Sequence, residues 1–136
     1  MLREAADLNQ QINDFGGTPA SIATSKAIFL LSCGKVYAVF GDKAQALASS
    51  SEAESLWKKV VGINPQQQVD AEGQIAELCL VRGDLYASSP ASRAEARNQY
   101  QRAIETLTKL KANNQIVLEG LKQLHEVQQK LQALSG

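Results

Sequence analysis

Gly83-Asp84-Leu85-Tyr86 and Ala96-Arg97-Asn98-Gln99-Tyr100 are the two segments that decide the fold of this chain. Each places a small residue three or four positions before an aromatic one. Residues with that spacing lie on the same face of an α-helix. The two segments therefore predict a pair of helices whose facing surfaces combine small residues with rings.

The same pattern occurs earlier in the chain, as Gly34-x-x-Tyr37 followed by Ala53-x-x-x-Trp57. A repeated helix pair cannot bury its apolar face alone, so it stacks against its neighbour. The repetition predicts a piece of helical solenoid, an architecture that binds other molecules rather than transforming them. We expect the rings of both patterns to pack in the core.

Helical periodicity extends over most of the chain, and no strand pattern competes with it. The expected helices cover residues 2–14, 20–40, 51–62, 67–88, 92–112 and 115–134. Ser51 and Ser92 each precede a glutamate by three residues, which predicts a capping box at the third and fifth helices. The small polar segment 43–51 is expected to be a connecting loop, with a helical turn at residues 44–47 as an alternative for part of it. These features predict an all-α fold, an antiparallel stack of about six helices.

The two patterns together resemble degenerate tetratricopeptide repeats. The residues that carry the resemblance are Gly34, Tyr37, Ala53, Trp57, Pro65, Gly83, Tyr86, Ala96, Tyr100 and Ala103. The resemblance implies an α-solenoid built as a tetratricopeptide-like superhelix. The family repeat is about 34 residues long, whereas Gly34 and Gly83 are 49 residues apart. The first repeat is therefore expected to contain an insertion, at residues 43–49.

The resemblance also implies one helical-repeat domain over residues 1–136. Its expected parts are an N-terminal helix and loop (1–19), a first repeat with an insertion (20–66), a second repeat (67–112) and a C-terminal capping helix (113–136). Residues 95–104 further resemble repeat segments found behind bacterial serine/threonine kinase domains. That likeness implies the repeat region of a larger bacterial regulatory protein.

In tetratricopeptide arrays the first helix of each pair lines a concave groove. The resemblance would place six residues of this chain there: Leu31, Lys35, Ala38, Leu80, Asp84 and Ala87. Leu31, Glu77 and Val81 stand where a carboxylate clamp would need basic or amide groups, so a mixed or apolar groove is expected. The implied function is a protein–protein interaction or scaffolding module that binds a peptide or helix of a partner protein.

Composition weighs against several other classes of function. Fourteen basic residues balance fourteen acidic ones, so no net field attracts a nucleic acid. The best uninterrupted apolar run, 27–31, is far shorter than a membrane span, so no membrane contact is expected. A single histidine, His125, and two separated cysteines, Cys33 and Cys79, form no catalytic or metal-binding motif. We therefore expect no enzyme activity, no cofactor and no metal.

The last helix leaves an alternative function open. Val117, Leu121, Leu124 and Leu131 approach the spacing of a coiled coil, although Gln128 interrupts the seam. In that case the chain would be a structural domain that forms a homodimer through its C-terminal helix. The N-terminus lacks the apolar core of a signal peptide, so a cytoplasmic location is expected unless the domain was excised from a longer chain.

Overall fold

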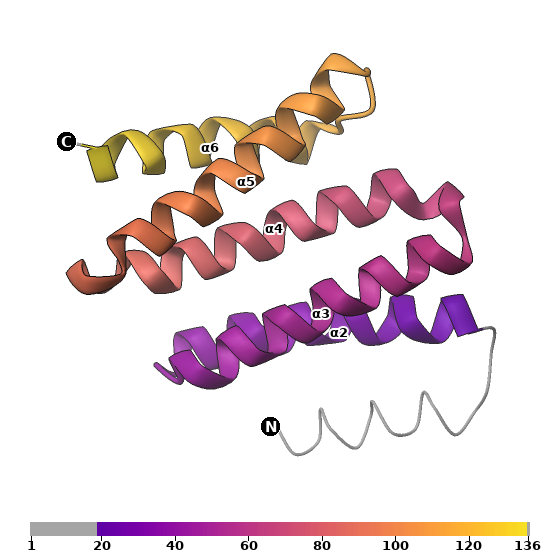
Figure 1. Cartoon of the computed structure of the whole chain (residues 1–136), viewed down its shortest axis with the longest axis horizontal. Helices are drawn as coiled ribbons and strands as arrows, with labels where there is room; N and C mark the ends of the chain where they lie inside the picture. The colour runs from indigo at the N-terminus through magenta and orange to yellow at the C-terminus, as the bar shows by residue number, and fades with distance from the viewer. Residues whose placement is uncertain (1–18, 136) are drawn as a thin grey trace. The chain divides into compact units, whose positions relative to one another are not determined.

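The computed structural model describes residues 19–135, and every regular element in that range is helical (Figure 1). The expected all-α fold is therefore confirmed. The described chain divides into two compact units, of which unit 1 ends at Ala71 and unit 2 begins at Glu72. The helix expected at residues 2–14, and the break at Gly16-Gly17 after it, lie outside the described residues.

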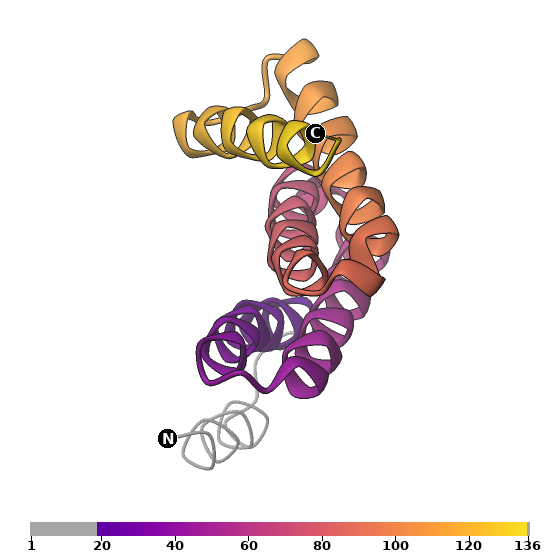
Figure 2. The same ribbon diagram turned by 90° about the vertical axis from the view of Figure 1, so that its left-hand side faces the viewer.

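Unit 1 is built on a helical hairpin. It contains α2 (Pro19–Val39), α3 (Lys43–Ile63), the short 3₁₀ turn η1 (Pro65–Gln67) and the first turn of α4 (Gln68–Ala87). The helices α2 and α3 pack side by side, as both Figure 1 and Figure 2 show. A turn of only three residues joins them, so they run antiparallel.

Small residues let α2 and α3 approach closely. A Cβ added to Gly34 would lie 3.1 Å from Ser50 Oγ and 3.5 Å from the Ala46 carbonyl oxygen. The Ser50 hydroxyl donates to that same carbonyl at 2.8 Å, so its polar atom is satisfied inside the interface. Ala27 and Ala53 are fully buried. The first glycine of the repeated pattern thus serves a close helix–helix contact.

The expected loop at residues 43–51 is wrong, because α3 begins at Lys43. Asp42 is its N-cap, and the Asp42 carboxylate accepts a hydrogen bond from the Gln45 amide at 3.2 Å. No glycine or proline interrupts the segment, and its serine side chains do not break the helix because Ser50 bonds back to the preceding turn. Residues 43–49 are therefore the first two turns of α3, and no separate insertion loop exists there.

The expected capping boxes are also wrong. Ser51 lies inside α3, where Glu54 pairs with Lys58 at 3.1 Å instead. Ser92 is the N-cap of α5 but makes no capping hydrogen bond through its side chain. Within the 3₁₀ turn η2 (Pro90–Ser92), the Ser92 amide, which the Glu95 side chain would have to cap, already donates to the Ser89 carbonyl at 3.1 Å. A competing local hydrogen bond thus removes the need for the box.

Unit 2 contains the rest of α4, η2, α5 (Arg93–Ala112) and α6 (Leu118–Ser135). The helix α4 matches its expected range of 67–88 to within one residue at each end, and α5 packs against α6. The expected interruption after α5 is confirmed, because Asn114 takes a φ of 56°. The Gln115 amide donates to the Leu110 carbonyl at 2.8 Å, which closes the helix in a Schellman motif.

The aromatic residues of the repeated pattern divide into two groups. Trp57 and Tyr100 are each 2% exposed, so the core position expected for them is confirmed. Tyr37 and Tyr86 are only partly buried. In α6, the buried stripe consists of Leu124 and Val127. The coiled-coil residues expected at the start of that helix remain exposed and are described below.

Candidate functional site

The corner between α2 and α3 is closed by a Schellman motif. Gly41 adopts a φ of 79°, a left-handed conformation that only glycine takes without strain. Its amide donates to the Ala38 carbonyl at 3.1 Å, and the Asp42 amide donates to the Tyr37 carbonyl at 2.9 Å. Since Asp42 also caps α3, the chain reverses at once, and the last side chains of α2 point away from the hairpin.

Two large apolar side chains are exposed at this corner. Val39 is 83% exposed and Phe40 is 71% exposed. With Lys35 and Val36 they line a shallow surface depression, called here the Phe40 depression. A cluster of exposed apolar groups beside one charge is a common feature of protein-binding surfaces. This is the first candidate site.

The groove residues expected in unit 1 lie near this depression but differ in exposure. Leu31 is buried in the core of the hairpin, whereas Lys35 is exposed and borders the depression. Ala38 is partly exposed on the same side of α2. Sequence analysis overlooked Val39 and Phe40. The signal that could have found them is an apolar pair immediately before the helix-ending Gly41-Asp42.

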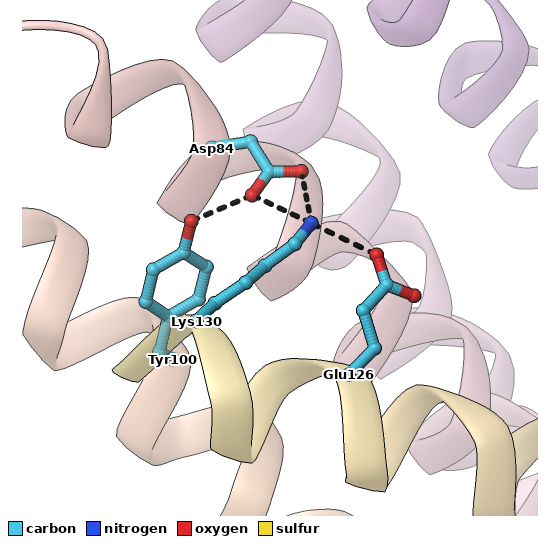
Figure 3. A network of polar contacts seen from close by, with 4 residues as sticks. All are labelled: Asp84, Tyr100, Glu126 and Lys130. Carbon is cyan, nitrogen blue, oxygen red and sulfur yellow. Dashed lines mark hydrogen bonds and ion pairs between the residues drawn. The ribbon is translucent and has the colours of Figure 1, made fainter. Parts of the chain in front are cut away.

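The groove residues expected in unit 2 include one that takes part in a polar network. Asp84 Oδ1 accepts a hydrogen bond from Tyr100 Oη at 2.6 Å. Lys130 Nζ lies 3.0 Å from Asp84 Oδ1 and 2.9 Å from Oδ2, and also 2.9 Å from Glu126 Oε1. Figure 3 shows the Lys130 ammonium between the two carboxylates. Residues from α4, α5 and α6 are thereby joined.

The electrostatics of the network favour the observed protonation states. Burial and the hydrogen bond to Asp84 raise the pKa of Tyr100 well above its usual value, so its hydroxyl stays a donor. Burial lowers the pKa of Lys130, but the two carboxylates outweigh that effect and the net change is upward. The Asp84 charge is therefore compensated within unit 2, and its first role in this structure is to hold α6.

The other two groove residues of α4 contrast with each other. Leu80 is buried and Ala87 is exposed. Along α4 the three expected residues share one face, since they are spaced by four and three positions. Of this set, only Asp84 and Ala87 present atoms to solvent, and Asp84 does so while bound to Lys130.

A second apolar patch lies at the start of α6. Val117 and Leu118 are each 69% exposed, and Leu121 is 38% exposed. Leu118 and Leu121 are three residues apart and share a face. This α6 patch is separate from the buried Leu124 and Val127 of the same helix. It is the second candidate interaction surface.

The helix α2 is long and apolar enough to cross a membrane by length and composition, with a mean hydropathy of 1.3. The length of its longest uninterrupted apolar run, 27–31, does not indicate that α2 could span a membrane, because polar residues separate its apolar residues along the chain. The core helix of a water-soluble protein passes the same test, and α2 packs against α3 and buries Ala23, Ala27 and Leu30. This property of α2 therefore supports either a core or a membrane environment.

The described residues contain no group of three or more histidine, cysteine or acidic side chains that could hold a metal ion. His125 is exposed on α6. Cys33 and Cys79 are free thiols, and burial raises the pKa of Cys33.

No model of a known protein family matches the chain, and neither a curated protein nor a solved structure shows significant similarity to it. Its function is therefore inferred from its own side chains.

Proposed function

We propose that this protein is an interaction module without catalysis, which binds an apolar segment of a partner protein at the Phe40 depression. The observation that carries the proposal is the exposure of Val39 and Phe40 at a rigid corner. The Schellman turn at Gly41 fixes the backbone next to both side chains, so little backbone entropy would be lost on binding. Aromatic side chains are enriched among the residues that dominate binding energy.

The charge near the depression indicates the chemistry of the partner. Lys35 is one of the four residues that line it. A peptide or helix with an apolar anchor and a nearby carboxylate would complement this surface. A tetratricopeptide-like arrangement of the helices is part of the same proposal. The contacts at Gly34 and Gly83 support it, because each glycine lets a neighbouring helix or ring approach closely.

A peptide-display selection against the full chain tests the proposal. We expect the selected peptides to carry an apolar residue near an acidic one, and Phe40→Asp to weaken their binding at least tenfold. Ile63→Asp is the matched control, because Ile63 is an exposed apolar residue at the other end of α3. Peptides that bind both variants as tightly as the wild type would place the interaction surface elsewhere and refute the proposal.

The α6 patch favours a second candidate function, homodimerisation through the C-terminal helix. Val117, Leu118 and Leu121 would be shielded if two copies paired there. Sedimentation velocity tests this candidate directly. A dimer that Leu118→Asp converts to a monomer, while the variant Gln101→Asp at an exposed polar position of α5 stays dimeric, would support it. A monomer at high protein concentration would exclude it.

A further inference from the structure

The buried stripe of α5 continues in phase through the loop that follows the helix. Its members alternate by steps of four and three residues, and they are Ala96, Tyr100, Ala103, Leu107 and Leu110. The same steps, continued from Leu110, reach Asn114, Val117, Leu121 and Leu124. This alternation keeps residues on one face of a helix. Residues 96–124 would therefore share one largely apolar face if they formed a single straight helix.

The structure instead folds the chain back at residues 113–117, called here the hinge, so that α6 packs against α5 (Figure 1). Asn114 has a φ of 56° and is the one non-glycine residue within 19–135 whose φ is positive. That conformation costs free energy in residues other than glycine, although asparagine tolerates it better than most. The hinge contains neither glycine nor proline. Its sequence is therefore compatible with a helix, and the observed turn carries a conformational cost.

The turn also leaves apolar side chains exposed. Val117 is 69% exposed and Leu121 is 38% exposed. In a straight helix both would lie on the same face as the buried Leu107 and Leu110, since all four belong to the four–three alternation. Straightening the hinge would thus extend the apolar face of α5 by two side chains that the folded-back form exposes to water.

The contacts that hold α6 are made away from the hinge. Leu124 and Val127 are its buried apolar residues. Lys130 Nζ lies 2.9 Å from Asp84 Oδ2 on α4, next to the Tyr100 hydroxyl of α5 (Figure 3). An α6 helix from a second copy of the chain carries the same side chains, so it can make the same contacts.

We propose that two copies of this chain exchange their α6 helices. The hinge straightens, α5 and α6 become one helix, and each α6 packs on α4 and α5 of the other copy. The ion pair of Asp84 with Lys130 then forms between chains, and Val117 and Leu121 of the two copies meet beside the two-fold axis. Exchange retains the contacts of the monomer and adds this new one, so it is a low-cost route to a dimer. The inference rests on the candidate homodimerisation and specifies how the copies join.

Complementary charge reversals in the full chain test the exchange. Asp84→Lys leaves a lysine facing Lys130, and Lys130→Glu leaves a glutamate facing Asp84, so each variant alone brings like charges together. Only exchange of α6 between the two variants gives each reversed residue an opposite charge. We expect the variants, refolded together from urea with one chain isotope-labelled, to form at least tenfold more mixed dimer than either same-variant dimer. Native mass spectrometry measures the three species.

Asp70→Lys mixed with Lys59→Glu is the matched control, because this pair carries the same charge changes at exposed positions outside the network. It should give mixed and same-variant dimers in statistical proportions. Statistical mixing of the Asp84→Lys and Lys130→Glu variants as well would overturn the exchange but leave homodimerisation standing. A wild-type chain that stays monomeric would overturn both. Neither result bears on peptide binding at the Phe40 depression.

The conformation of Asn114 provides a second test that changes no charge. Asn114→Gly removes the cost of the positive φ and disfavours a straight helix, so it should weaken the dimer. Asn114→Ala should strengthen it, because alanine is a strong helix former and is strained at positive φ. We expect the dimer dissociation constants of the two variants, measured by sedimentation velocity, to differ at least tenfold.

The control for this test is a position that is helical in both forms. Asn98 is exposed within α5, so Asn98→Gly and Asn98→Ala should dimerise equally well. Equal dissociation constants for the two Asn114 variants, or tighter association of Asn114→Gly, would overturn the inference.

Discussion

The ring of Tyr100 occupies the space beside Gly83 that any other residue would need for its Cβ. A Cβ built on Gly83 would lie 2.6 Å from Tyr100 Cδ1, far inside contact distance. The hydroxyl of the same ring donates to Asp84, the next residue of α4. The glycine and the tyrosine therefore position each other, and the position of Tyr100 in turn supports the network with Lys130.

Gly83→Ala should lower the free energy of unfolding by about 1–3 kcal/mol, since overpacking costs that much. Gly73→Ala in the same helix should raise it by up to ~1 kcal/mol, because alanine is the better helix former and nothing lies within 4 Å of the added Cβ. Urea unfolding measures both values. A shift of the two midpoints in the same direction would contradict the close contact.

Trp57→Ala should cost about 3–5 kcal/mol of stability, the usual range for removing a buried large aromatic side chain. Trp57→Phe should cost much less. It keeps a ring in the core, and it removes an indole N–H that has no hydrogen-bond partner in the structure. Circular dichroism during urea unfolding follows both variants. Equal losses from the two would show that packing of the ring is not what Trp57 contributes.

The start of α3 can be tested at its cap. Asp42→Ala should cost about 0.5–2 kcal/mol, the usual effect of losing an N-cap, whereas Asp42→Asn should retain most of the stability. Ser51→Ala should be nearly neutral, because Ser51 is an exposed residue inside the helix. Thermal and urea unfolding distinguish the two positions. A large loss from Ser51→Ala would favour a helix that begins at Ser51.

Stability should fall at high pH partly through Tyr100. Burial and the hydrogen bond to Asp84 raise its pKa in the folded state, so above about pH 10, the usual tyrosine pKa, the unfolded chain loses the proton first. This contribution is complete below that pH and declines as the pH rises towards the folded-state value. Tyr100→Phe should flatten the decline measured by urea unfolding between pH 9 and 11. Tyr86→Phe, at a partly exposed ring, should leave the slope unchanged.

Helix content and most helix ends could be predicted from local patterns. The helix α4 matched its predicted range closely, and Asn113-Asn114 ended α5 as expected. The error at residues 43–51 has a local cause. A serine-rich segment without glycine or proline can be a loop or a helix, and the pairing of Ser50 with Ala46 beneath Gly34 favours the helix.

The candidate sites were less accessible to sequence analysis. Asp84 was predicted as a partner-binding residue, but its carboxylate is bound to Tyr100 and Lys130, which is 46 positions away in the chain. No local pattern reveals a contact at that separation. Val39 and Phe40 escaped notice for the opposite reason, because an apolar residue at a helix end is buried in some folds and exposed in others.

The sequence by itself determined that this chain is helical, where most of its helices end, and that small residues and rings recur on their faces. Those properties depend on hydrogen bonds and side-chain spacing within a few residues. Only the tertiary structure decided which apolar side chains are covered and which charges are paired. Burial and ion pairing depend on which distant segments meet, and that information is not contained in any one helix.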